Sequence, residues 1–321
     1  VMRGWPDNFV HCVVTSPPYW LLRNYGVPGQ YGQEPKMGDY IAKMVEVFRE
    51  SRRILNKDGT LWLNLGDSFN LAGRASKYGE DEIRGTVDNL KSKDLCGIPW
   101  RVAIALQADG WCLRSDIIYS KSNPMPESVT DRPTRSHEYL FLLSKSERYF
   151  YDAEAIKEPG SLSTLERLDQ KTFITQTGGP KDPKTGNRSH RKVLENLKKR
   201  VDKQRGHSRR HSGFNDRFDA MSKEEQCVLM RNKRSVWTIA TEPFRGAHFA
   251  TFPQKLIEPC ILAGCPLKGI VLDPFMGSGT TGLVAAKHGR NFLGIELNPS
   301  YVDMARERVR LEIAQTKIAF P

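Results

Sequence analysis

Near the end of the chain, a short apolar run, a glycine-containing loop and a helix-forming stretch follow one another. Gly269–Asp273 is β-rich up to its final carboxylate, the next six residues include Gly277 and Gly279, and Thr280–His288 suits a helix. A strand joined to a helix by a glycine loop is half of a parallel βαβ unit, with its ligand site at the carboxyl end of the strand. The sequence therefore predicts an α/β protein.

The same loop matches the Gly-x-Gly-x-x-Gly pattern typical of dinucleotide binding, and Glu296 follows Asp273 by 23 residues, where a carboxylate would meet ribose hydroxyls. A nicotinamide-binding half-domain is thus one interpretation. However, only 25 residues follow Glu296, so the other strands must come from the N-terminal two thirds. In addition, a carboxylate at the strand tip repels a pyrophosphate, whereas it suits the ammonium and sulfonium of S-adenosylmethionine. We therefore favour the methyl donor.

A second motif at a strand tip is Thr15-Ser-Pro-Pro-Tyr-Trp20, which directly follows the apolar run Phe9–Val14. Pro17 and Pro18 have no N–H to donate, so the carbonyls just before them are not used up by a regular hydrogen-bond ladder. A hydroxyl, a carbonyl and an aromatic ring at such a tip can bind a flat molecule that carries an amino group. A rigid turn with an incidental tyrosine would have the same sequence, so the hexapeptide alone leaves both interpretations open.

Periodicity and breakers predict the remaining elements. The expected helices are 39–56, 99–110, 255–262 and a last helix that opens at Pro299. The expected strands are 60–65, 111–119, 138–143 and 291–296, with 149–151 as a possible hairpin partner of 138–143.

Charge is concentrated in one quarter of the chain. Residues 155–235 hold 20 Lys and Arg against 10 Asp and Glu, which is most of the net charge of +12. A solvated or disordered segment would also be rich in lysine, but charge so localised favours a nucleic-acid surface.

The six cysteines form no CxxC pair and no His/Cys spacing fits a metal, so we expect reduced thiols and no metal site. No apolar run reaches the roughly 20 residues of a membrane span, and no membrane partner is expected.

Two motifs and their order along the chain resemble those of the DNA amino-methyltransferases. The first is Thr15-Ser-Pro-Pro-Tyr19, and the second is Asp273-Pro-Phe-Met-Gly-Ser-Gly-Thr-Thr281. The resemblance is to their beta group, in which the catalytic motif precedes the cofactor motif. It implies a Rossmann-like α/β sheet that depends on S-adenosylmethionine, in circularly permuted motif order, with an inserted basic recognition region. The implied segments are a catalytic segment over residues 1–155, a target-recognition insertion over residues 156–235 and an S-adenosylmethionine-binding segment over residues 236–321.

The resemblance also implies roles for individual residues. The target base would be held by Ser16, Pro17, Pro18 and Tyr19. S-adenosylmethionine would be bound by Asp273, Phe275, Gly277, Gly279, Thr280, Glu296, Phe252 and Pro253. Double-stranded DNA would be contacted by Arg188, Arg191, Lys192, Lys198, Lys199, Arg200, Arg209 and Arg210. A cognate restriction endonuclease that acts separately is a possible partner, and the expected setting is the cytoplasm of a bacterium, with the protein bacterial or phage-encoded.

The chemistry suits these residue types. An exocyclic base amine is a poor nucleophile, and acceptors such as the Ser16 hydroxyl and the Pro17 carbonyl favour a nitrogen with a free lone pair. Tyr19 would stack on a base that has left the duplex. Within the resembling family, Ser at the first motif position favours cytosine N4, whereas Asp favours adenine N6. Transfer to cytosine N4 is therefore predicted, with adenine N6 or an inactive DNA-binding protein of the same fold as alternatives.

Overall fold

The computed structural model describes residues 1–70, 90–159, 230–241 and 252–319. The chain divides into two compact units, Val1–Asp152 with Arg234–Pro321, and Ala153–Lys233. The second unit contains the described strands β5 (Glu158–Pro159) and β6 (Met230–Arg231), which pair with each other. The segment boundaries expected at 155/156 and 235/236 and the recognition role of the insertion stay predictions.

The first unit is built around a mixed sheet of seven strands in the order β7-β3-β4-β2-β1-β8-β9. The strands are β1 (Val10–Thr15), β2 (Leu55–Leu65), β3 (Cys112–Lys121), β4 (His137–Ser144), β7 (Val236–Ile239), β8 (Ile270–Asp273) and β9 (Asn291–Gly294). β4 runs antiparallel to both of its neighbours, and the other pairings within this seven-stranded sheet are parallel. The predicted α/β class is therefore confirmed.

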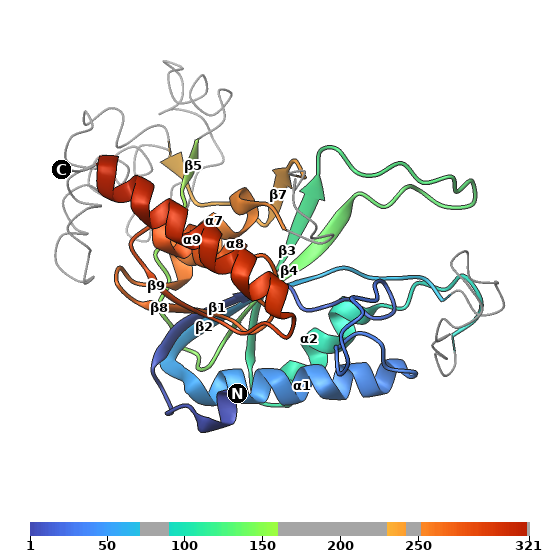
Figure 1. The fold of residues 1–321 in the computed structure, drawn as a ribbon. Helices are drawn as coiled ribbons and strands as arrows, with labels where there is room; N and C mark the ends of the chain where they lie inside the picture. Colours follow the sequence, from blue (N-terminus) through green and yellow to red (C-terminus); the bar gives the residue numbers. More distant parts are fainter. Residues whose placement is uncertain (71–89, 160–229, 242–251, 320–321) are drawn as a thin grey trace, which may run out of the picture. The chain divides into compact units, whose positions relative to one another are not determined.

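Helices cover both faces of this sheet (Figure 1). One side carries α1 (Met37–Ile54) and α2 (Ile98–Ala108), and the other carries α7 (Gln254–Gly264), α8 (Thr280–Lys287) and α9 (Pro299–Ala319). On the first side, Met44 and Phe48 of α1 are fully buried in one hydrophobic core with Leu61 and Leu63 of β2. On the second, a Cβ at Gly264 would lie 2.4 Å from Nε1 of Trp62, so only glycine allows α7 this close to the sheet.

Two local predictions differ from the structure. Residues 149–151 form no strand, because β4 already pairs with β2 on one side and β3 on the other, so the hairpin prediction was wrong. The helix predicted over 39–56 ends at Ile54, and β2 begins at Leu55, which pairs with Val10 of β1. Tertiary pairing thus extended the strand into residues that local patterns placed in a helix and turn.

Candidate functional site

The carboxyl ends of several strands converge at one edge of the sheet. β1 lies between β2 and β8 and runs parallel to both, so Thr15 and Asp273 end at the same edge although 258 residues separate them. Because β4 is antiparallel to β2, it brings its first residues, including Glu138, to this edge as well. The two sequence motifs therefore meet where an open α/β sheet binds ligands.

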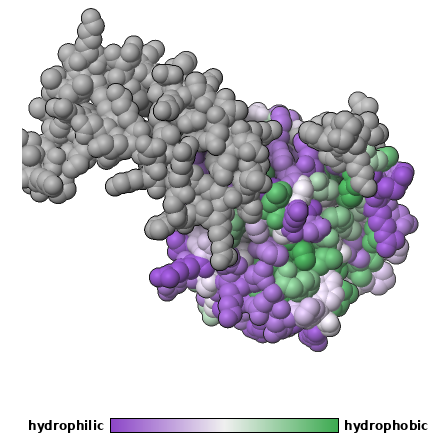
Figure 2. Space-filling view, turned by 90° about the vertical axis from the view of Figure 1, so that its left-hand side faces the viewer, coloured by the Kyte–Doolittle hydropathy of each residue, from purple (hydrophilic) through white to green (hydrophobic). Residues whose placement is uncertain are grey.

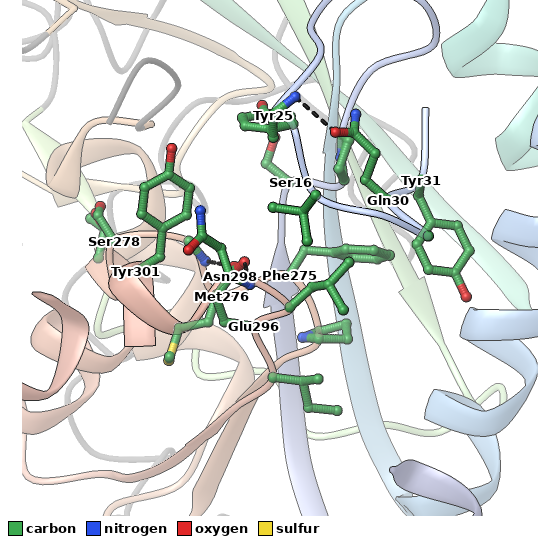
Figure 3. Close-up of a pocket in the computed structure, with 18 of the residues that line it drawn as sticks. Ser16, Tyr25, Gln30, Tyr31, Phe275, Met276, Ser278, Glu296, Asn298 and Tyr301 are labelled. Atoms are coloured by element: carbon green, nitrogen blue, oxygen red, sulfur yellow. Dashed lines mark hydrogen bonds between the residues drawn. The ribbon is translucent and has the colours of Figure 1, made fainter. Parts of the chain in front are cut away.

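A cavity of about 300 Å³ opens at this edge (Figure 3). Seven of the residues predicted from the sequence line it: Ser16, Pro18, Phe252, Phe275, Gly277, Thr280 and Glu296. Aromatic side chains that the prediction did not include also line it, among them Tyr31 and Tyr301. The ring of Tyr31 packs edge-on against Phe275 with 5.6 Å between ring centroids. The cavity thus combines apolar walls with a few polar groups, as small-molecule sites do.

Glu296 is the acidic side chain of this cavity. Its Oε2 accepts a hydrogen bond from the backbone N–H of Gly277 at 2.8 Å, and its Oε1 accepts one from the backbone N–H of Asn298 at 2.9 Å. Both oxygens are therefore fixed by backbone donors, and each has acceptor capacity left. A carboxylate fixed in this way can accept hydrogen bonds from two neighbouring hydroxyl groups, such as those of a ribose.

The carboxylate of Asp273 lies in a different place from the one that the sequence predicts. We expected its carboxylate beside the ligand, but the residue is 1% exposed and does not line the cavity. One oxygen accepts hydrogen bonds from the Thr15 hydroxyl at 2.6 Å and the Phe275 amide at 3.0 Å, and the other accepts one from the Thr281 hydroxyl at 2.6 Å. Burial raises the pKa of Asp273 to about 6, although these hydrogen bonds lower it. The carboxylate joins the tips of β1 and β8 and fixes the cofactor-type loop.

Four other predicted residues are absent from the cavity wall: Gly279, Pro253, Pro17 and Tyr19. Gly279 caps α8 with φ +79°, and a Cβ there would lie 2.6 Å from the Cβ of Ala305 in α9. Pro253 caps the start of α7, and Pro17 is buried behind the lining residue Ser16. The first three of these residues shape the backbone near the cavity without lining it.

Behind Ser16 lies a hydrogen-bond network that sequence reasoning missed. The Tyr19 hydroxyl lies 3.3 Å from the Ser16 oxygen and donates to Oε2 of Glu138 at 2.8 Å. Nδ2 of Asn64 lies 2.8 Å from the Tyr19 oxygen and 2.9 Å from the Glu138 carboxylate. Lys121 pairs with the other oxygen of Glu138 at 2.5 Å. A charged residue directly before the apolar run 139–143 was the available signal for Glu138.

This network fixes the tyrosine of the motif. Burial, followed by the charge of Glu138, raises the pKa of Tyr19 well above its ordinary value, so the phenol stays protonated. Its ring packs so closely on Gly66 that a Cβ there would lie 2.5 Å from Cε2 of the ring. The carbonyl of the neighbouring Pro18 accepts a hydrogen bond from Tyr40 at 2.9 Å. The motif is therefore rigidly positioned from three directions.

The eight basic residues predicted to contact DNA, from Arg188 to Arg210, lie outside the described residues. Among the described residues, no group of His, Cys, Asp and Glu could hold a metal ion, and no helix is long and apolar enough to cross a bilayer. Figure 2 shows hydrophobic side chains bordered by hydrophilic ones on one face of the described part.

Comparisons with known proteins show what this chain is similar to. Residues 10–307 match the family model of a DNA methylase. The chain is 44% identical over 316 residues to the type II methyltransferase M.SmaI of Serratia marcescens, covering 96% of this chain and 87% of that protein.

Solved structures of low identity share the fold. PvuII DNA methyltransferase, described as cytosine-N4-specific, has a TM-score of 0.57 at 17% identity and covers 96% of this chain and 82% of its own. A Thermus thermophilus protein described as a DNA modification methylase, in complex with S-adenosyl-L-methionine, has a TM-score of 0.53 at 21% identity, with 97% and 90% covered.

Proposed function

Because this chain belongs to the DNA methylase family and is therefore a DNA methyltransferase, we propose that it methylates the exocyclic N4 amine of cytosine in double-stranded DNA. The observation that carries the proposal is the shared cavity, since Ser16 and Pro18 line it together with Gly277 and Glu296. A base held by the first pair is thus adjacent to a donor held by the second pair. Positioning two reactants in this way is most of what an in-line transfer needs.

The residues of the cavity fit S-adenosylmethionine, the methyl donor of this enzyme. Glu296 presents two oriented carboxylate oxygens for ribose hydroxyls, and Phe275 and Tyr301 offer rings for an adenine. S-adenosylmethionine supplies a methyl group on a sulfonium, which is an excellent leaving group. Asp273, Gly279 and Pro253 would contribute by shaping the loop and the helix starts around the donor.

The acceptors at the motif would prepare the base. The Ser16 oxygen in the cavity wall would accept a hydrogen bond from one hydrogen of the amine, and the carbonyl of Pro17, the next residue along the chain, would accept the other, so that the nitrogen lone pair is free to attack. Among the described residues, no hydrogen bond to the Pro17 carbonyl is found, whereas the Pro18 carbonyl is taken by Tyr40. Once the amine has accepted the methyl group, its nitrogen would release one proton to the surrounding water. The base would reach the cavity by leaving the duplex.

Ser16 favours cytosine N4 over the alternative, adenine N6. A neutral hydroxyl and a carboxylate can both accept from an amine, so the preference rests on the family resemblance of the motif. The fold neighbour PvuII methyltransferase is described as cytosine-N4-specific, which supports the same choice. For the insertion 156–235, we propose contact with DNA phosphates through its basic residues. A cognate restriction endonuclease is the proposed separate partner.

The test is incubation with labelled S-adenosylmethionine and unmethylated DNA, followed by digestion to nucleosides. We expect labelled N4-methylcytosine; N6-methyladenine would establish the alternative base, and 5-methylcytosine alone would refute the mechanism. Ser16→Ala is expected to bind the donor normally in calorimetry but to lose most of the rate. If the unaltered protein binds no donor, the inactive DNA-binding alternative is correct.

A further inference from the structure

Glu138 and Lys121 form an ion pair at the edge of the sheet that carries the Ser-Pro-Pro-Tyr motif, and the proposed mechanism gives neither residue a role. Lys121 ends β3 and Glu138 lies at the start of the adjacent β4, so the sheet itself brings them together. Their charged atoms lie 2.5 Å apart, and the side chains are 26% and 17% exposed. A pair this close and this shielded is screened much less than an exposed one.

The carboxylate of this pair is held in its charged form. Burial alone would raise the pKa of Glu138, but the charge of Lys121 and hydrogen bonds from three neighbouring side chains outweigh burial, so the pKa lies below its ordinary value. An ionised carboxylate has no hydrogen to donate. Each group that contacts Glu138 must therefore point a hydrogen toward it.

This requirement sets the hydrogen positions along the chain of contacts that leads to Ser16. The Tyr19 hydroxyl has one hydrogen and must donate it to Oε2 of Glu138, 2.8 Å away. The Tyr19 oxygen is then an acceptor, and the Ser16 hydroxyl, 3.3 Å away, donates to it. With its hydrogen directed away from the cavity, the Ser16 oxygen accepts a hydrogen bond from Nδ2 of Asn64 at 3.4 Å and keeps one lone pair for a ligand in the cavity. Ser16 is thereby an acceptor before any base arrives.

We propose that Glu138, paired with Lys121, is a positioning residue that acts through Tyr19 to keep Ser16 an acceptor for the hydrogen of the target amine. The inference deepens the proposed function and rests on it, because it concerns an amine bound at Ser16. No proton passes along the chain. Glu138 determines which way two hydroxyl hydrogens point, so its effect falls on the methyl-transfer step and not on donor binding.

Glu138→Gln tests the proposal with little change in shape. The glutamine amide can donate to the Tyr19 oxygen, which lets Tyr19 donate to Ser16 and turns the Ser16 hydrogen into the cavity. We expect the single-turnover rate of methyl transfer to fall about 10- to 100-fold, the loss typical of removing a hydrogen bond to a charged group. Donor affinity in calorimetry should stay within about twofold. Glu307→Gln, which breaks the exposed Glu307–Arg310 pair on α9, is the matched control and should leave the rate unchanged.

Two further measurements separate this role from a merely structural one. In Tyr19→Phe, which removes the connecting hydroxyl, Glu138→Gln should add no further loss of rate, because the two residues act in one chain. In Lys121→Met, the acidic limb of the pH–rate profile should move to higher pH, because the charge that lowers the pKa of Glu138 is gone.

Each outcome decides the proposal. Multiplicative losses in the double variant, an unmoved acidic limb, or a Glu138→Gln variant as fast as the unaltered protein would overturn it. If the unaltered protein labels no exocyclic amine in DNA digested to nucleosides, the proposed function fails instead. The two failures are therefore distinguishable.

Discussion

Asp273→Asn is the most informative substitution for the stability of this site. The carboxylate is buried, and its pKa in the folded protein is about 6, against 3.8 in an exposed chain. A carboxyl with a higher pKa in the folded state binds its proton more tightly there, so this group stabilises the fold as the pH falls and the stabilisation is lost as the pH rises through 6. The full difference corresponds to about 3 kcal/mol in the free energy of unfolding.

About half of this effect lies between pH 8 and pH 5. Between these values, the two pKa values imply that Asp273 adds about 1 kcal/mol to the free energy of unfolding of the unaltered protein. Asparagine does not titrate, so the variant lacks this gain, while contributions from the other ionisable groups cancel in the comparison. We expect the stability of Asp273→Asn relative to the unaltered protein to be lower at pH 5 than at pH 8 by that amount.

The assay is urea unfolding of both proteins at the two pH values, followed by tryptophan fluorescence. Thr281→Val serves as a companion variant, because losing one donor raises the pKa of Asp273 further and should enlarge the gain between pH 8 and pH 5. A stability difference that stays constant between the two pH values would show that the hydrogen bonds balance the effect of burial on the pKa, and one that moves in the opposite direction would show that they outweigh it; either result would refute this reasoning.

Three other predictions concern the cofactor loop and the insertion. Gly279→Ala should lower the free energy of unfolding by about 2 kcal/mol or more, measured by urea denaturation, because φ is +79° and the new Cβ would meet Ala305; an unchanged midpoint would contradict this. Glu296→Gln should weaken donor binding about tenfold in calorimetry, since an amide nitrogen cannot accept one of the two backbone hydrogen bonds; equal affinity would rule out the ribose role. Deletion of 185–210 should weaken DNA binding and flatten its salt dependence, and an unchanged salt slope would mean that this tract is only solvated.

The sequence by itself determined the fold class and the two motifs. Apolar runs predict β1 and β8. The prolines and glycines that follow these runs predict where the strands end, because each of these residues restricts or frees the backbone at its own position. Local signals of this kind also located α1, α7 and α8 within a few residues. They failed at residues 55–59 and 149–151, where pairing between strands decided the outcome.

Only the tertiary structure decided which polar groups meet. The sequence placed Asp273 at a strand tip, but the direction of its carboxylate depended on Thr15, which lies 258 residues away and on the neighbouring strand. The sequence likewise did not predict that Glu138 and Lys121 contact each other or the motif, because a charged side chain at a strand end is usually solvated. The antiparallel β4 carries Glu138 to the edge where β1 presents Tyr19. Contacts between residues so far apart in the chain follow from sheet order, which no local pattern encodes.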